Sequence, residues 1–254
     1  MEDILLAIPS YRRHRVETLG SYSRFHVFVS ESEYEEYRRF NEGAYIDTMP
    51  DKVQGNLCRA RNYIIDYAFN NGYEGVVIID DDLSGIYRWD AIGTFGYDQH
   101  KLTDKELETF IENGFNLCYE WGYKMWGLNC SKQNKLAYRQ FCPFNTNQYI
   151  GGPFQAFLKN DIRYDERLSL KEDYDMTLQH LRKYGGVLRF NQYHYMCRQA
   201  EQSGGCANYR NMEEEKRQFE LLQKKWGSKI IKEDRSSKRC YDFNPIMKSP
   251  IKGV

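Results

Sequence analysis

The sequence lacks any cysteine pattern that would staple a small domain or hold a zinc ion. It contains seven cysteines, an odd number, and no two of them are separated by just two residues. Paired cysteines at fixed spacings are what mark disulfide frameworks and zinc sites. Their absence argues against both and favours reduced thiols, so we expect an intracellular protein.

Net charge and long apolar runs are also missing. Lys and Arg number 36, and so do Asp and Glu, so no overall field draws the chain to nucleic acid or to a membrane surface. No apolar stretch approaches the roughly 20 residues needed to cross a bilayer, and the first residues carry no basic segment like that of a signal peptide. We therefore expect a cytoplasmic protein without membrane contact. With 254 residues, it can form one large α/β domain with an appendage.

What the sequence does contain is an acidic cluster directly after an apolar run. Residues 76–79 are consecutive β-branched residues, and Asp80, Asp81 and Asp82 follow at once. Such a run predicts a strand buried on both faces, and open α/β sheets bind ligands at the carboxyl ends of their strands. Adjacent carboxylates repel one another, so a Mg²⁺ or Mn²⁺ ion that also takes substrate phosphates is expected among them. A helix N-cap is the alternative, although a cap needs a single Asp.

Apolar periodicity predicts the remaining elements. Strands are expected over 4–8, 25–29, 125–129, 148–150 and 187–190. One more strand is expected to follow the pair Gly151-Gly152 and to end at residue 158. Helices are expected over about 32–42, 55–71, 103–121, 172–184 and 213–226, the third opened by a capping box from Thr103 to Glu106. The aromatic stretch 83–96 is expected to be an ordered loop over the acidic cluster. Strands that alternate with helices predict an α/β fold.

Basic side chains are placed to meet the phosphates of such a substrate. A cationic loop, residues 11–15, follows the first strand and the Pro9-Ser10 pair, with a solvated turn as the alternative. Arg59 and Arg61 lie in the first turns of the helix over 55–71, whose positive end favours a diphosphate.

A second acidic cluster opens the helix over 172–184. Glu172, Asp173 and Asp175 suit the helix dipole there, so a structural role remains open. If this cluster faces the first one across a cleft, it supplies a general base. His194 is the best-placed histidine for a ligand or base, with core packing as the alternative. The pair Gly151-Gly152 predicts a close backbone approach, or else a plain turn.

The chain from residue 216 onward differs from the rest in charge. It holds eleven Lys and Arg against four Asp and Glu, so the first 215 residues carry the opposite excess. A basic end suits a polyanion such as nucleic acid. A solvated basic helix and tail is the alternative.

These motifs, taken in order, resemble those of GT-A-fold nucleotide-sugar glycosyltransferases over residues 4 to about 210. The resemblance rests on the strand that ends in Pro-Ser-Tyr, on Gly-Asn-x-x-Arg-Ala-Arg-Asn at 55–62, on the triple Asp and on Glu-Asp-x-Asp at 172–175. The segments 151–157, 171–175 and 198–205 are most similar to phage-type TET/J-binding-protein-associated glycosyltransferases. Those enzymes glycosylate 5-hydroxymethylpyrimidines in DNA.

The resemblance implies a GT-A-like, Rossmann-related mixed sheet flanked by helices, over residues 1–210. A basic helical extension, 211–254, would pack on this domain or follow it. It also implies a metal-dependent, inverting transfer of a hexose or pentose from a UDP-sugar to the hydroxyl of a 5-hydroxymethylpyrimidine in DNA. The protein would act in the cytoplasm, that of the host if a phage encodes it. The oligomeric state stays open.

The resemblance also assigns roles to individual residues. Asp173 would be the catalytic base, with Glu172 beside it. The donor would be bound by Pro9, Ser10, Tyr11, Arg13, Arg61, Asp80 and Asp81. The Mn²⁺ or Mg²⁺ ion would be bound by Asp80, Asp82 and His194. The acceptor would be bound by Trp89, Gly151, Gly152, Asp175 and Arg198.

Two other functions remain compatible with the sequence. A GT-A transferase with a saccharide or protein acceptor would share the donor and metal sites but make no use of the basic tail. A non-catalytic nucleic-acid-binding module on the same scaffold would need neither acidic cluster. A two-carboxylate glycosidase fits less well, because acids beside cationic loops suit a phosphate-bearing donor.

Overall fold

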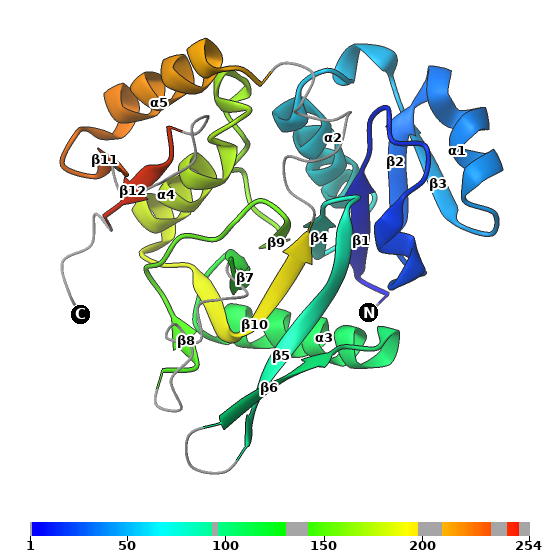
Figure 1. Ribbon diagram of the computed structural model, residues 1–254, viewed down its shortest axis with the longest axis horizontal. Coiled ribbons are helices and arrows are strands. Elements are labelled where there is room, and N and C mark those ends of the chain that lie inside the picture. The colour runs from blue at the N-terminus through cyan, green and yellow to red at the C-terminus, as the bar shows by residue number, and fades with distance from the viewer. Residues whose placement is uncertain (1, 93–95, 131–141, 198–209, 235–242, 249–254) are drawn as a thin grey trace.

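A ten-stranded mixed sheet forms the centre of the computed structural model, which describes residues 2–92, 96–130, 142–197, 210–234 and 243–248 (Figure 1). The strands are β1 (Ile4–Pro9), β2 (His26–Ser30), β3 (Tyr45–Met49), β4 (Gly75–Ile79), β5 (Leu83–Ile92), β6 (Gly96–Lys101), β7 (Met125–Asn129), β8 (Phe144–Asn145), β9 (Phe154–Leu158) and β10 (Leu188–Cys197). Their order is β3-β2-β1-β4-β9-β7-β10-β5-β6, with β8 paired to β10.

Both strand directions occur in this sheet. The first four strands pair in parallel, β9 is antiparallel to both β4 and β7, and β5 is antiparallel to β10. β1 and β4 therefore end at the same edge, which brings the loop after Pro9 next to Asp80.

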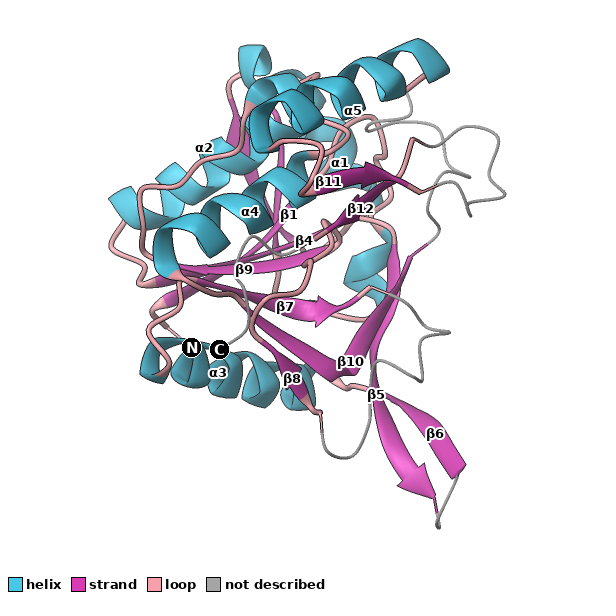
Figure 2. Cartoon of the chain, turned by 90° about the vertical axis from the view of Figure 1, so that its left-hand side faces the viewer, coloured by secondary structure: helices cyan, strands magenta, loops and turns pink. Residues whose placement is uncertain are grey.

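Helices cover the two faces of the sheet. They are α1 (Tyr34–Phe40), α2 (Leu57–Asn70), α3 (Asp104–Glu120), α4 (Glu172–Tyr184) and α5 (Met212–Trp226). α3 lies on one face, and α2 and α4 lie on the other (Figure 2). The mixed sheet flanked by helices confirms the predicted fold class. None of the helices in the described ranges is long and apolar enough to span a bilayer.

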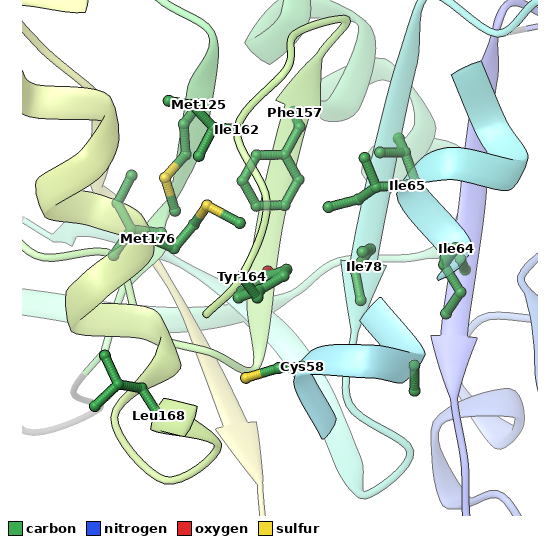
Figure 3. Packing of buried hydrophobic residues seen from close by; sticks show 14 of the residues in the cluster. Cys58, Ile64, Ile65, Ile78, Met125, Phe157, Ile162, Tyr164, Leu168 and Met176 are labelled. Atoms are coloured by element: carbon green, nitrogen blue, oxygen red, sulfur yellow. The ribbon is translucent and has the colours of Figure 1, made fainter. Parts of the chain in front are cut away.

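Alternate residues of the central strands enter two separate cores. Ala7 and Ile78 pack with α2, α4 and β9 in the core that Figure 3 shows. Their neighbours Ile8 and Ile79 pack instead with α3 and β7. This burial of both faces explains why the sequences of β1 and β4 are apolar throughout rather than alternating.

The described residues after 210 pack on the same domain. Phe219 and Leu222 of α5 and Ile231 belong to the core beneath α2 and α4. Ile231 opens β11 (Ile231–Glu233), which pairs with β12 (Pro245–Met247) as a small antiparallel sheet. The basic segment thus contributes apolar side chains to the core of the domain.

Several elements differ from the sequence expectation. The stretch 83–96 is not a loop, because its described residues form β5 and the start of β6 in a hairpin paired with β10. Residues 148–150 are not a strand, and β10 extends beyond 190 to Cys197. β3 was not predicted, since Tyr45–Met49 lies at an edge and is mostly exposed or half-buried. The predicted capping box of α3 is confirmed.

Candidate active site

A cleft of about 760 Å³ opens at the carboxyl ends of β1 and β4. Asp80, Asp81 and Asp82 line it, and so do Glu172 and Asp173 at the start of α4. The two acidic clusters, 90 residues apart in sequence, are thus brought to one site. Most of the predicted donor residues also line the cleft, namely Pro9, Ser10, Tyr11, Arg13 and Arg61.

Asp81 is bonded to the loop that follows β1. The Ser10 hydroxyl donates to its Oδ2 at 2.5 Å, and Arg13 Nη1 lies 2.7 Å from its Oδ1. Tyr37 of α1 is within 2.8 Å of the same Ser10 hydroxyl. Burial raises the pKa of Asp81, against the opposing effect of Arg13. Asp81 therefore positions the loop after β1, and the residue is only 7 % exposed.

The environment of Asp82 disfavours the negative charge of its carboxylate. Its pKa is raised to about 7, first by burial and then by the carboxylates of Asp80 and Asp81. Arg13 Nη1, at 3.4 Å, is the cation that opposes this shift. A hard divalent cation beside Asp82 would stabilise the charged form.

The residues of the cleft fit a Mg²⁺ or Mn²⁺ ion that is shared with a substrate. Among the described residues, no three His, Cys, Asp or Glu side chains converge as a ready metal site. Mg²⁺ commonly takes one or two protein carboxylates and completes its shell with waters and phosphates. Asp82 and Asp80, whose side chain is 29 % exposed, are placed to serve as those two carboxylates.

Arg61 links the two acidic clusters. Its side chain is 1 % exposed, and Nη2 lies 2.8 Å from Asp80 Oδ1 and 3.0 Å from the carbonyl oxygen of Gly152. Nη1 lies 3.2 Å from Glu172 Oε1. Asn56 caps the start of α2 with its side chain, which sets the helix so that Arg61 points into the cleft. Arg61 was predicted to bind the donor. In the structure its guanidinium contacts three oxygen atoms of the protein itself.

Glu172 is buried beside this arginine. Burial and the neighbouring Asp173 raise its pKa to about 8, and the Arg61 guanidinium opposes the rise. A Cβ on Gly152 would lie 3.3 Å from both Arg61 Nη1 and Glu172 Oε1. The glycine therefore allows the close backbone approach that the sequence predicted.

Asp173 is held by groups on both of its oxygens. The Tyr149 hydroxyl donates to Oδ2, which also accepts from the Gly152 N–H at 3.2 Å. The Tyr174 N–H donates to Oδ1 at 2.9 Å. Tyr149 and Tyr174 stack with ring centroids 4.2 Å apart. Tyr149 was missed by the sequence analysis, because only folding brings it to Asp173.

His194 does not join the acidic cluster, which corrects its prediction as a metal ligand. Its neighbour Tyr195 lines the cleft, so His194 points to the opposite face of the sheet. There it stacks on Tyr87 at 5.6 Å and on Trp89 at 5.0 Å, fully buried. Burial lowers its pKa to about 4, and neither ring nitrogen has a hydrogen-bond partner in the part of the chain that the structure describes.

Three predicted acceptor residues also lie elsewhere. Trp89 is 3 % exposed and packs against His194 instead of lining the cleft. Asp175 is fully buried and accepts from Trp226 Nε1 at 2.7 Å and Lys225 Nζ at 2.9 Å, so it anchors the end of α5. Gly151 is buried and is not among the residues that line the cleft; a Cβ there would lie 2.2 Å from the Tyr195 hydroxyl. Arg198 lies outside the described residues.

The C-terminal segment contributes cleft residues that the sequence analysis did not single out. Asn211, Glu215, Asp234 and Asn244 line the cleft together with Lys171. No spacing signal marks them, because they come from α5 and from the ends of β11 and β12.

A mixed sheet with acidic residues at the end of its central strand and a cleft at that edge places the chain among GT-A-fold proteins. The family model of the TET-associated glycosyltransferases matches residues 8–205, so the chain belongs to that family.

One of the similar solved structures supports the fold assignment. Glucosyl-3-phosphoglycerate synthase from Mycobacterium tuberculosis, crystallised with Mn²⁺, UDP-glucose and phosphoglyceric acid, superposes with a TM-score of 0.50 at 11 % identity, covering 98 % of this chain and 88 % of that one. S. aureus TarS 1–349 gives a TM-score of 0.44 at 13 % identity over 75 % of this chain. The chain covers 59 % of that TarS chain and 36 % of a second TarS structure. No curated protein sequence matches this chain.

Proposed function

We propose that this protein transfers a sugar from a UDP-sugar to the hydroxyl of a 5-hydroxymethylpyrimidine in DNA, with a divalent metal ion and with inversion at the anomeric carbon. The observation that supports the proposal is that Asp80, Asp82 and Asp173 all line a single cleft. A group transfer of this kind needs negative charge to be stabilised at the leaving group and a base at the acceptor.

The first half of the cleft would hold the donor. The loop from Pro9 to Arg13 would contact the nucleotide. Hydrogen bonds from Ser10 to Asp81 and Tyr37 hold this loop at the edge of the cleft. Asp80 and Asp82 would hold Mn²⁺ or Mg²⁺, which supplies a Lewis acid for the departing diphosphate. Glucosyl-3-phosphoglycerate synthase, which shares the fold, was crystallised with Mn²⁺ and UDP-glucose, and this supports the choice of donor and metal.

The second half would activate the acceptor. Asp173 would take the proton of the acceptor hydroxyl while that oxygen attacks the anomeric carbon and the bond to the UDP oxygen breaks. Tyr149 and the Gly152 N–H hold one carboxylate oxygen in place, so the base is positioned before the acceptor binds. Glu172 would keep Arg61 directed toward Asp80.

The DNA acceptor is supported by the name of the family and by the basic excess of the C-terminal segment. The protein would act in the cytoplasm, where DNA is accessible.

The test is UDP release from a panel of UDP-sugars with Mn²⁺, with and without DNA containing 5-hydroxymethylcytosine. Wild type is compared with Asp82→Ala, Asp173→Asn and the control Asp161→Asn, whose side chain is 75 % exposed and outside the cleft. We expect release to need both the metal and the modified DNA, to be lost in the first two variants and to persist in the control. Absence of release with every donor would contradict the proposal and would favour a binding module on this scaffold.

A saccharide or protein acceptor is the second candidate, and one observation favours it. Several basic side chains of the C-terminal segment already have acidic partners in the chain, for example Lys225 with Asp165 and Asp175, and Arg217 with Glu214. Ion pairs within the fold therefore neutralise part of the positive charge of this segment. Metal-dependent UDP release that does not respond to modified DNA would select this candidate.

A further inference from the structure

A short segment, residues 149–152, contacts the proposed base without belonging to a helix or a strand. The Tyr149 hydroxyl and the Gly152 N–H both donate to Asp173 Oδ2. A segment outside regular structure has no ladder of hydrogen bonds, so other groups must bind its buried backbone atoms. The placing of these two donors at Asp173 therefore depends on the side chains that contact the segment.

Arg189 of β10 binds this segment at Tyr149. Its Nη1 donates to the Tyr149 carbonyl oxygen at 3.2 Å. Its Nε donates to Asn191 Oδ1 at 3.1 Å, and its Nη2 donates to Asn145 Oδ1 at 3.4 Å. Asn191 Nδ2 donates to the same Asn145 oxygen at 2.6 Å, between the paired strands β8 and β10. These bonds fix the plane of the guanidinium and direct Nη1 at the Tyr149 carbonyl.

The charge of Arg189 is balanced by neutral groups only. The oxygens that accept from it belong to two amides and one peptide carbonyl, and no carboxylate within the described ranges pairs with it. Burial lowers the pKa of Arg189, and the Cys130 thiol opposes this shift most. Burying a cation without an anion costs free energy, and an apolar side chain would fill the space without that cost. This cost indicates a role beyond packing.

That role does not involve contact with a substrate. Tyr149 and Asp173 line the cleft, whereas Arg189 is not among the lining residues. Any effect of Arg189 on the reaction must pass through a residue that it holds, and Tyr149 is the cleft residue to which it donates a hydrogen bond.

The geometry of this contact suits arginine and not lysine. A guanidinium presents its donors in one rigid plane, so it can bind oxygens from three separate residues at once. An ammonium carries the same charge as a single point on a flexible stem. Arg189→Lys therefore keeps the charge and removes the fixed directions of the donors.

We propose that Arg189 is a positioning residue for the proposed base: it holds Tyr149 by the carbonyl oxygen and so sets the Tyr149 hydroxyl at Asp173 before the acceptor binds. This inference rests on the proposed function and adds a residue to its machinery. The expected effect on rate is large, since misplacing reacting groups by about 1 Å can slow a reaction by about a hundredfold.

The experiment is a double-mutant cycle on kcat, measured as UDP release by the full chain with Mn²⁺ and DNA containing 5-hydroxymethylcytosine. Arg189→Lys is expected to lower kcat by about tenfold. KM for the UDP-sugar should not change, because the contacts of Arg189 lead to Asp173 and not to Asp80 or Asp82. In a Tyr149→Phe background the same substitution should lower kcat by about twofold or less, because the hydroxyl through which Arg189 acts is already missing.

Arg163→Lys is the matched control. Arg163 is 29 % exposed and also donates to backbone carbonyls, those of Asn160 and Ile162, but it does not line the cleft. This variant should keep the kcat of wild type in both backgrounds.

A second variant covers the case in which Arg189→Lys does not fold. Asn145→Ala removes an oxygen that orients the guanidinium and leaves Arg189 itself in place. It should lower kcat in the wild-type background and not in the Tyr149→Phe background. Urea denaturation with and without UDP and Mn²⁺ checks that each variant is folded and binds these ligands as wild type does.

The outcomes separate the two proposals. If Arg189→Lys lowers kcat by the same factor in both backgrounds, or changes kcat no more than Arg163→Lys does, positioning through Tyr149 is overturned and the proposed function stands. A rise in KM for the donor that matches the fall in kcat would overturn it as well. If wild type releases no UDP with the modified DNA, the proposed function fails and this inference fails with it.

Discussion

Arg61 and Asp80 form an ion pair inside the cleft, with Nη2 of the guanidinium 2.8 Å from Oδ1 of the carboxylate. The same guanidinium reaches Glu172 and the carbonyl of Gly152. The end of β4 and the start of α4 are thereby held together through one side chain of α2. The two acidic clusters are thus parts of a single charged network, and four predictions test its parts.

Replacing Arg61 by Met is expected to lower the free energy of unfolding by about 3 kcal/mol or more, because it leaves buried acidic groups without their partner. Urea denaturation measures the change. Arg167→Met is the control, since that arginine is 67 % exposed in its pair with Asp165 and solvent screens the pair, so its loss should change the free energy of unfolding far less. Equal effects for the two variants would show that the buried network adds no special stability.

Glu172→Gln is expected to change how stability depends on pH. The pKa of Glu172 is raised to about 8 from an ordinary value of 4.5, chiefly by burial. Between these values the folded chain binds the proton and the unfolded chain does not. The stabilisation from this group is therefore complete below about pH 4.5 and is lost as pH rises through 8.

Gln has no such proton to lose, so the stability of the variant relative to wild type should increase as pH rises across that range. Denaturation at several pH values measures the difference, with the exposed Glu120→Gln as control. A difference that stays constant with pH would mean that Glu172 titrates normally.

Tyr149→Phe removes the hydroxyl that donates to Asp173 Oδ2. If Asp173 is the base, its carboxylate loses a group that holds one of its oxygens in place. We expect kcat to fall and KM for the donor to stay unchanged. Steady-state kinetics measure both. Tyr45→Phe is the control, at a position 57 % exposed; an unchanged kcat in Tyr149→Phe would exclude positioning of the base by Tyr149.

Asp82→Asn and His194→Phe compare a candidate metal ligand in the cleft with the histidine that lies on the opposite face of the sheet. Mn²⁺ with UDP should stabilise wild type by about 2.7 kcal/mol when present at a hundredfold excess over the dissociation constant. We expect Asp82→Asn to lose this stabilisation and His194→Phe to keep it, because His194 lies on the opposite face of the sheet. Denaturation with and without Mn²⁺ and UDP measures the effect. Loss in His194→Phe alone would restore the histidine as a ligand.

Local patterns were sufficient for much of this fold. The β-branched run before Asp80 predicted a strand buried on both faces, and β4 is such a strand. The capping box at Thr103 predicted the start of α3 correctly. The hairpin of β5 and β6 was missed, because its strands are defined by pairing with each other and with β10. Pairing between distant strands leaves little trace in local periodicity.

In the candidate site, too, local sequence patterns predicted some features and contacts between distant residues decided the others. By itself, the sequence determined that carboxylates follow a buried strand and open a later helix, because strand ends and first turns are marked by neighbouring residues. Only the tertiary structure decided which groups meet. Arg61 and Glu172 are 111 residues apart, Tyr149 reaches Asp173 across 24, and His194 faces away from the acids it was expected to join. Such contacts depend on the relative placement of whole elements, which packing determines and sequence spacing does not.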